Sequence, residues 1–371
     1  MNGFYWIYLV MMAFLVGYDY AKTSEQKRLI YYSACGFLIL IFAVQDSSVS
    51  IDIAEYMRQW DIIPSLSFGE MLVHKFEIGY VLLCWALERL FESERVLLLV
   101  LGVMIMLPFC RSFEKETENP MIALMAFLAL GMYMHAMIFW RQLVAMAILT
   151  CAYRFIRERR FIPFLLIVLV AMSFHKVAVV FIPLYIVYNI PINKWLLAGC
   201  VICSVVLGIF GDEIIEFGIS TIYPRYENFP RLVIGGDTLL ALLWVVALLS
   251  YWLLRDRMND PKVRLPFLMV LVAATIQPVC FAFYNWLRVV LFFRIALVPM
   301  TVHLYVALFQ QKEGNKALTM LKRYTPNLHA IVLPLYDKKW FRVVTQLIMF
   351  AVLFVWYVSE LDEAVYIMAP I

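Results

Sequence analysis

The residues best suited to chemistry lie in two short polar runs inside an otherwise apolar part of the chain. Arg141 is followed by Gln142, and His175 is followed by Lys176, with long apolar segments on either side. An ionisable side chain at membrane depth is costly unless it is paired, hydrated or used in function. We therefore take these groups as candidates for a functional site and ask which elements position them.

The composition indicates that these elements are membrane helices. The chain has 371 residues, of which 64% are apolar and only 16% charged, whereas a soluble domain is usually about one quarter charged. Apolar runs approaching the roughly 20 residues that cross a bilayer recur along the chain. A soluble bundle of this size would need many more polar helix faces. The sequence predicts an all-α, polytopic helical membrane protein.

Charge placement predicts about twelve transmembrane helices with both ends outside. Lysine and arginine collect in cytoplasmic loops. The basic segments satisfy this rule together if 77–91 stays at the outer surface and 161–188 turns back at His175. The expected spans are roughly 4–18, 29–44, 95–110, 120–138, 140–156, 161–174, 176–188, 195–211, 238–254, 265–283, 287–309 and 342–358.

The loops predict an outward-facing site. We expect residues 1–371 to form a single integral membrane domain with two carboxylate-rich outer loops, about 45–94 and 211–237. The basic cytoplasmic loop, about 310–342, is expected to hold an interfacial helix attracted to anionic lipid headgroups. On this map Arg141, His175 and Arg288 all lie near the outer surface.

Four segments carry a family resemblance. Residues 52–56 read Asp-x-x-x-Tyr, residues 76–80 read Phe-Glu-x-Gly-Tyr, and residues 141–145 read Arg-Gln-x-x-Ala. The fourth is a basic turn at 159–160 followed by an apolar segment that ends in Phe-His-Lys at 174–176. In this order they resemble the EpsG/Wzy-type family of bacterial polysaccharide polymerases, and residues 288–299 resemble its late arginine-bearing span.

The resemblance implies a glycosyltransferase, with an architecture like that of the GT-C membrane enzymes. Its substrates would be oligosaccharide repeat units on undecaprenyl pyrophosphate, one acting as donor and one as acceptor. The reaction would take place at the outer face of the bacterial cytoplasmic (inner) membrane and build O-antigen, capsule or exopolysaccharide. Expected partners are the lipid bilayer and a chain-length regulator and flippase of the same pathway, and no nucleic acid.

The reaction assigns roles to candidate residues. A pyrophosphate leaving group needs fixed positive charge, for which arginine's planar fork is well suited, and a hydroxyl nucleophile benefits from a positioned base. The expected catalytic residues are Arg141, His175, Asp52 and Glu77. The expected substrate-binding residues are Arg288, Arg294, Gln142, Tyr56, Arg58 and Tyr80.

The sequence also predicts a reaction without a metal or other cofactor. The outer loops contain no Asp-x-Asp pair, and the histidines form no cluster along the chain. In the family an arginine often precedes the Asp-x-x-x-Tyr element. Here Gln45 stands near that place, and Arg58 is the alternative source of positive charge in the loop.

Each candidate has a purely structural alternative. Arg141 could extend to the outer interface, and His175 could donate to a carbonyl group within its turn. Glu77 could cap a helix N-terminus. Asp52 could pair with Arg58, and Arg294 could pair with a buried carboxylate.

Three other functions stay open. An O-antigen ligase would use the same donor with a different acceptor, and a membrane O-acyltransferase would modify surface glycans without lengthening them. A flippase or exporter for lipid-linked oligosaccharides would move its substrate unchanged. A transporter is expected to have internal repeats and broken helices near the bilayer midplane, and the two halves of this sequence show no convincing repeat.

Overall fold

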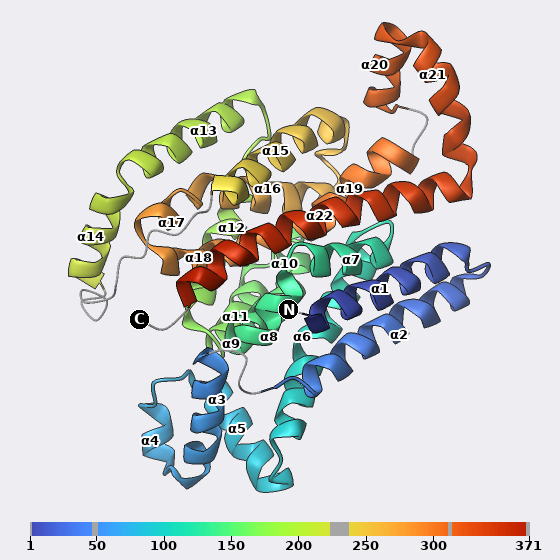
Figure 1. The fold of residues 1–371 in the computed structure, drawn as a ribbon. Coiled ribbons are helices and arrows are strands. Elements are labelled where there is room, and N and C mark those ends of the chain that lie inside the picture. The colour runs from blue at the N-terminus through green and yellow to red at the C-terminus, as the bar shows by residue number, and fades with distance from the viewer. Residues whose placement is uncertain (1, 47–50, 223–236, 311–313, 369–371) are drawn as a thin grey trace. The chain divides into compact units, whose positions relative to one another are not determined.

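All regular structure in the described part of the chain is helical (Figure 1). The computed structural model describes residues 2–46, 51–222, 237–310 and 314–368. Most of the expected outer loop 211–237 therefore lies outside the described residues. The chain divides into two compact units, residues 1–185 and 186–371, and each is described by itself. The single integral membrane domain stays a prediction.

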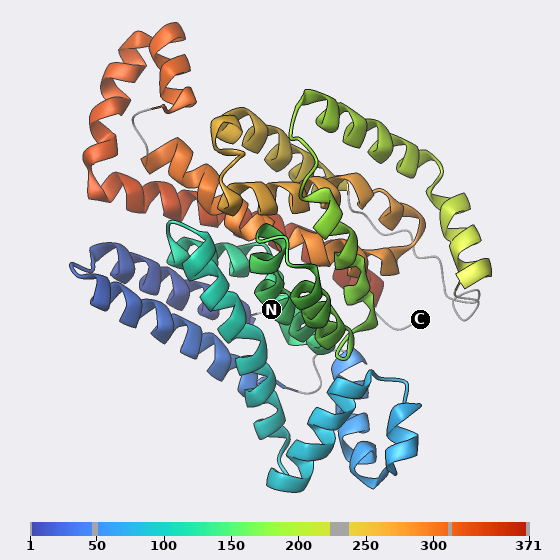
Figure 2. The ribbon, with the colours of Figure 1, turned by 180° about the vertical axis from the view of Figure 1, so that it is seen from behind.

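The first unit contains the segments with candidate site residues 52–176. Helices α1, α2 and α6 lie side by side in it, as both views show (Figures 1 and 2). Its elements are α1 (Asn2–Tyr20), α2 (Ser24–Ala43), α3 (Ile51–Ile62), η1 (Ile63–Ser65), α4 (Phe68–Leu72), α5 (Ile78–Phe91), α6 (Glu94–Glu116), α7 (Pro120–Ala129), α8 (Met132–Ile138), α9 (Trp140–Leu149), η2 (Thr150–Ala152), α10 (Tyr153–Arg157), α11 (Phe161–Met172), η3 (Lys176–Phe181) and α12 (Ile182–Val187), within which the unit ends.

The second unit contains the late arginine-bearing segment and the basic loop. Its elements are α13 (Lys194–Ile209), α14 (Gly211–Ile222), α15 (Asp237–Leu254), η5 (Arg255–Arg257), α16 (Pro261–Ile276), α17 (Val279–Ala282), η6 (Tyr284–Trp286), α18 (Leu287–Arg294), α19 (Leu297–Tyr305), the π-helical turn η7 (Val306–Gln310), α20 (Lys316–Tyr324), α21 (Pro326–Val332), η8 (Leu333–Asp337) and α22 (Lys339–Met368).

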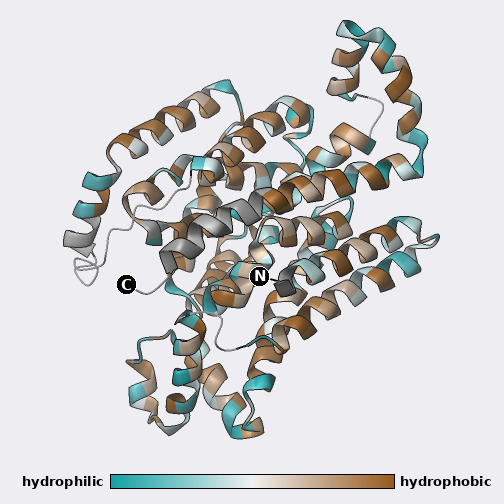
Figure 3. Cartoon of the chain, in the orientation of Figure 1, coloured by the Kyte–Doolittle hydropathy of each residue, from teal (hydrophilic) through white to brown (hydrophobic). Residues whose placement is uncertain are grey.

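Polar residues at the helix ends explain where the apolar helices begin. Thr23 forms a reciprocal capping box with Gln26 at the start of α2. Asn119 accepts hydrogen bonds from two backbone N–H groups at the start of α7, where Pro120 occupies the first helical turn. Such caps satisfy N–H groups that have no partner inside the helix. Apolar residues accordingly dominate the longer helices, and hydrophilic residues gather near many of their ends (Figure 3).

Several described helices are suited to crossing a membrane. Three are long and apolar enough by length and composition alone, namely Glu94–Glu116, Asp237–Arg257 and Leu287–Gln310. Two bent helix pairs raise this number to as many as five if each pair counts as one span. The helical membrane class is thus supported by at least three candidate spans in the described part of the chain. The count of twelve stays a prediction.

The expected span 120–138 is a broken helix. Helices α7 and α8 meet at an angle of 62°. Between them Gly131 has φ of +75°, a conformation that residues with a Cβ atom rarely adopt. The apolar pattern of the sequence did not reveal this break, because both halves are apolar and only Leu130 and Gly131 separate them.

The predicted hairpin at 161–188 is confirmed. Helix α11 ends at Met172, and the chain resumes helical structure at Lys176. The ring of Tyr185 lies 5.2 Å from that of Phe161 and 5.1 Å from that of Phe164, between centroids. The last part of the segment therefore runs back along the first, and His175 lies at the turn.

A close backbone contact joins this turn to the start of α5. The Gly79 N–H donates to the Ser173 carbonyl oxygen at 2.7 Å. A Cβ atom added at Gly79 would lie 2.5 Å from Ser173 Oγ and 2.7 Å from that carbonyl oxygen. Only glycine allows the two segments to approach this closely.

We predict that Gly79→Ala destabilises the protein by about 1–3 kcal/mol, because the added methyl group overpacks this contact. Gly36→Ala is the matched control, since a Cβ atom at that position in α2 meets nothing within 4 Å. Thermal unfolding of both purified variants checks the prediction. Equal melting temperatures would show that the contact at Gly79 is not a tight one.

Candidate functional site

The centre of the candidate site is an ion pair between Glu77 and Arg141. The Nη1 group of Arg141 donates to Oε2 of Glu77. The two side chains are only 14% and 9% exposed. Arg141 therefore does not extend to the surface as an interfacial arginine would, and its charge is matched inside the protein.

Glu77 is held in place from its other carboxylate oxygen. Its backbone caps α5, and its carbonyl oxygen accepts from the Tyr80 and Val81 N–H groups. Its side chain makes no capping bond to that helix. Instead Oε1 accepts the backbone N–H of Lys176 at 3.1 Å. Glu77 is thus the N-cap residue of α5, as the structural alternative had it, but its carboxylate bonds to the Lys176 N–H and to Arg141 rather than to that helix.

His175 lies directly beside this carboxylate. It is the residue before η3, and its side chain is buried. Its Nδ1 atom is 3.7 Å from Oε1 of Glu77. The structure thus brings together three residues that the sequence separates widely, Glu77, Arg141 and His175. Each comes from a different segment of the family resemblance.

Aromatic rings surround the guanidinium group. The Cζ atom of Arg141 lies 4.1 Å from the centroid of the Phe76 ring and 5.6 Å from that of Tyr56. Tyr56 stacks on Trp140 with centroids 4.8 Å apart and an angle of 19° between the rings. Tyr80 packs against Phe76 at 5.7 Å. Cation–π contact stabilises the charge, and the rings keep the guanidinium in one position.

The burial of this pair makes each partner dependent on the other. Removing one member of a buried ion pair typically costs about 3–5 kcal/mol, because the remaining charge is left without compensation. The same low-dielectric surroundings strengthen the interaction of Arg141 with any anion that reaches it. The arrangement can therefore bind an anionic group that replaces the carboxylate.

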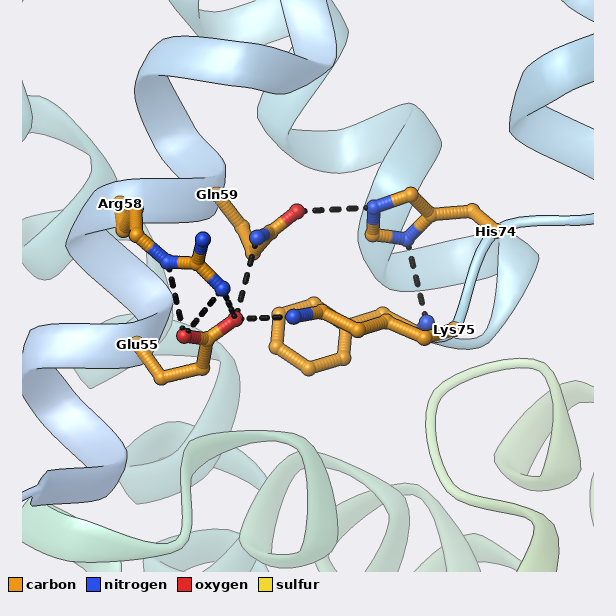
Figure 4. A network of polar contacts seen from close by, with 6 residues as sticks. Glu55, Arg58, Gln59, His74 and Lys75 are labelled. Carbon is orange, nitrogen blue, oxygen red and sulfur yellow. Dashed lines mark hydrogen bonds and ion pairs between the residues drawn. The ribbon is translucent and has the colours of Figure 1, made fainter.

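A second polar network lies beside the site, in α3 and the turn before α5 (Figure 4). Glu55 accepts two hydrogen bonds from Arg58, at 2.9 Å from Nε and 3.0 Å from Nη2. It also accepts from Lys75 and from the Gln59 amide group. The Lys75 ammonium group, followed by Arg58, lowers the pKa of the Glu55 carboxyl group. The network ties α3 to the residues directly before Glu77.

His74 completes this network as a neutral side chain. Its Nδ1 accepts the Phe76 backbone N–H at 3.1 Å, and its Nε2 lies 2.9 Å from Oε1 of Gln59. Nδ1 therefore carries no proton, and Nε2 donates to the amide oxygen. Burial lowers the pKa of His74, and the positive charges of Lys75 and Arg141 lower it further.

The remaining outer-loop candidates, Asp52 and Arg58, both lie in α3. Arg58, considered above as a partner for Asp52, binds Glu55. Asp52 lies in the first turn of α3. It precedes Tyr56 by four residues, so both lie on the same helix face.

Three of the expected substrate contacts in the first unit are enclosed by protein. Tyr80 has no exposed surface, and Gln142 is 2% exposed. Tyr56 is also buried. The rings of Tyr56 and Tyr80 support Phe76 and Arg141 from within, so in this conformation they act on a ligand through the residues they position.

Arg288 and Arg294 belong to the second unit. Arg288 is in the first turn of α18 and is partly buried, whereas Arg294 is its last residue and is 5% exposed. Arg294 is therefore enclosed by protein. Their part in substrate binding stays a prediction.

Several site residues were missed by sequence reasoning. Phe76 and Gly79 lie inside the Phe-Glu-x-Gly-Tyr element, and Trp140 directly precedes Arg141. Their positions in these segments were a usable signal. The i,i+3 spacing of Glu55 and Arg58 on a helix also pointed to a pair. In the described residues, no group of three or more histidine, cysteine, aspartate or glutamate side chains is placed to hold a metal ion.

The family model described as the EpsG family matches residues 28–322, a range that includes every segment of the candidate site. No curated protein and no solved structure matches the chain.

We predict that stability falls as the pH drops below about 6.5, the pKa of an unperturbed histidine. Above that value His74 is neutral in the folded and unfolded states, and its contribution to stability is fully present. Below it His74 binds a proton in the unfolded chain but stays neutral in the folded protein until the pH reaches its lowered pKa. Folding therefore becomes less favourable over this range. Melting temperatures between pH 8 and pH 5 check this. His74→Gln is expected to flatten the slope in that window, and an unchanged slope would assign the effect to other groups.

Proposed function

Since the chain belongs to the EpsG family, which indicates a polysaccharide polymerase-type role, we propose that it joins lipid-linked oligosaccharide repeat units into a surface polysaccharide. The donor and acceptor are repeat units on undecaprenyl pyrophosphate. A hydroxyl group of the acceptor attacks the anomeric carbon of the donor, and the lipid pyrophosphate leaves. The product is O-antigen, capsule or exopolysaccharide.

The observation that supports this proposal most directly is the buried Arg141 guanidinium. It lies against Phe76 with its charge matched by Glu77. The leaving group gains negative charge as the glycosidic bond breaks, and a fixed cation in a low-dielectric site stabilises that charge. Arginine can hold two phosphate oxygens at once. We assign Arg141 to the leaving pyrophosphate.

The other candidates take supporting roles in this proposal. Glu77, His175 and Asp52 are the possible bases for the attacking hydroxyl group. Arg58 and Lys75 supply exposed positive charge beside the site, with side chains 62% and 41% exposed. Arg288 and Arg294 are proposed to contact the second lipid-linked substrate or its pyrophosphate.

The proposed location is the outer face of the bacterial cytoplasmic membrane. The flanking network of α3 and the turn before α5 is polar (Figure 4), and its Arg58 and Lys75 side chains are 62% and 41% exposed, which suits an aqueous surface. Lipid-linked substrates would approach from the bilayer. A flippase that delivers them and a chain-length regulator are the proposed pathway partners.

We predict that Arg141→Lys lowers chain extension at least about tenfold, because lysine keeps a charge for Glu77 but loses the planar fork. Arg141→Ala is expected to abolish extension. The measurement is the length distribution of polysaccharide made from a defined lipid-linked oligosaccharide by the purified protein.

The matched control is Arg157→Lys in α10, which changes the comparably buried Arg157–Glu116 pair and is expected to leave extension unchanged. Near-normal polymer from an inserted, folded Arg141→Ala protein would exclude Arg141 from the chemistry. Transfer of one unit to a lipid A core, acyl transfer without lengthening, or movement of unchanged lipid-linked oligosaccharide would each point to one of the other functions.

A labelling experiment tests the orientation. Val73, between α4 and α5, is 83% exposed, and Val73→Cys should react with a membrane-impermeant maleimide in right-side-out vesicles. The background would carry serine at the exposed native positions Cys151 and Cys203. Arg154→Cys, on a side chain 71% exposed in α10, should react only after permeabilisation. The reverse pattern would place the site on the cytoplasmic side.

A further inference from the structure

The ion pair at the centre of the site occupies both groups that the proposed reaction needs. Arg141 must bind the pyrophosphate, yet its Nη1 group is bonded to Glu77. Glu77 is the carboxylate nearest to it, yet Oε2 is bonded to that same guanidinium. Opening this contact frees Oε2 of Glu77 and the Nη1 group of Arg141, which is then available together with the other guanidinium N–H groups.

Each partner is also held independently of the pair. Glu77 is held through Oε1, which accepts the Lys176 N–H at 3.1 Å. Arg141 is held by the Phe76 ring, 4.1 Å from Cζ. Neither anchor uses Oε2 or Nη1. The contact between these two atoms can open while the carboxylate and the guanidinium both stay near their present positions.

We propose that the donor's pyrophosphate displaces the Glu77 carboxylate from Arg141, and that Oε2, once free, is the general base of glycosyl transfer. This inference rests on the proposed function. A diphosphate carries two negative charges and several acceptor oxygens, so it competes well with one carboxylate for a guanidinium. Donor binding thus activates the base, and the base is occupied when no donor is bound.

Oε2 takes the proton of the acceptor hydroxyl group, whose oxygen forms the bond to the anomeric carbon. The bond between that carbon and the phosphate oxygen breaks, and its electron pair leaves on the lipid diphosphate. The negative charge that Glu77 loses on protonation appears on the leaving group, beside Arg141. Solvent then removes the proton from the carboxyl group, and Nδ1 of His175, 3.7 Å from Oε1, is placed to help it leave.

Glu77→Gln separates this role from a structural one. Glutamine has the same shape, and its amide oxygen can still accept the Lys176 N–H, but it cannot accept a proton at neutral pH or compete as an anion for Arg141. We expect chain extension to fall by about 10²–10⁴-fold, the usual contribution of a general base. Binding of farnesyl diphosphate, used as the probe, should tighten by about tenfold because no carboxylate has to be displaced.

A residue that merely positions Arg141 would give the opposite binding result. Removing it would loosen the guanidinium, so the probe would bind more weakly to Glu77→Gln or equally well. Either outcome overturns the exchange, and chain extension at wild-type rate overturns the role as base.

Glu116→Gln is the matched control, since Glu116 and Arg157 form an ion pair of comparable burial, with side chains 14% and 18% exposed. This variant should leave both probe affinity and chain extension unchanged once amounts of folded protein are matched. A similar tightening in Glu116→Gln would mean that the probe binds to any uncovered arginine, and it would overturn the assignment to Arg141.

The experiment also distinguishes failure of this inference from failure of the proposed function. If wild-type protein extends chains but Glu77→Gln does not bind the probe more tightly, the polymerase proposal stands and the exchange is wrong. If wild-type protein neither extends chains nor binds the probe, the proposed function is wrong, and the exchange is overturned with it.

Discussion

The site depends on one electrostatic constraint, that a guanidinium enclosed by apolar helices must have an anion next to it. Arg141 satisfies it with Glu77. The carboxylate is in turn fixed by the Lys176 N–H group. These contacts constrain how three distant segments of the first unit pack, because separating Arg141 from Glu77 would leave a buried charge without a partner. The rings of Phe76 and Tyr56 pack near the cation.

This constraint explains why the short Phe-Glu-x-Gly-Tyr segment needs these residue types at these positions. Phe76 supports the guanidinium, Glu77 pairs with it, and Gly79 permits the contact with Ser173 that brings the 173–176 turn within reach. Tyr80 is fully buried behind them. Each residue has a different physical task, and the tasks depend on spacing, so the segment works only as a unit.

The sequence predicted the parts of this site better than their assembly. Apolar runs predicted the helical class, and basic loops predicted the turn at His175, because both signals are local. The Glu77–Arg141 pair joins positions 64 residues apart, and its existence depends on helix packing that no local pattern records. The break at Gly131 was missed for a similar reason. One glycine in an apolar run is compatible with a straight helix or a bent one, and only its φ of +75° decides.

Glu77 precedes Arg141 in the sequence, and this order affects how the protein is inserted into the membrane. Ribosomes deliver the N-terminal partner first, so Glu77 has already emerged when Arg141 reaches the membrane. The counter-ion of Arg141 is therefore already present, and the arginine need not enter the bilayer as an unpaired charge. The hairpin bearing Lys176 follows and holds the carboxylate from its other oxygen. The nascent protein can thus neutralise this buried cation early, before the second half of the chain has been made.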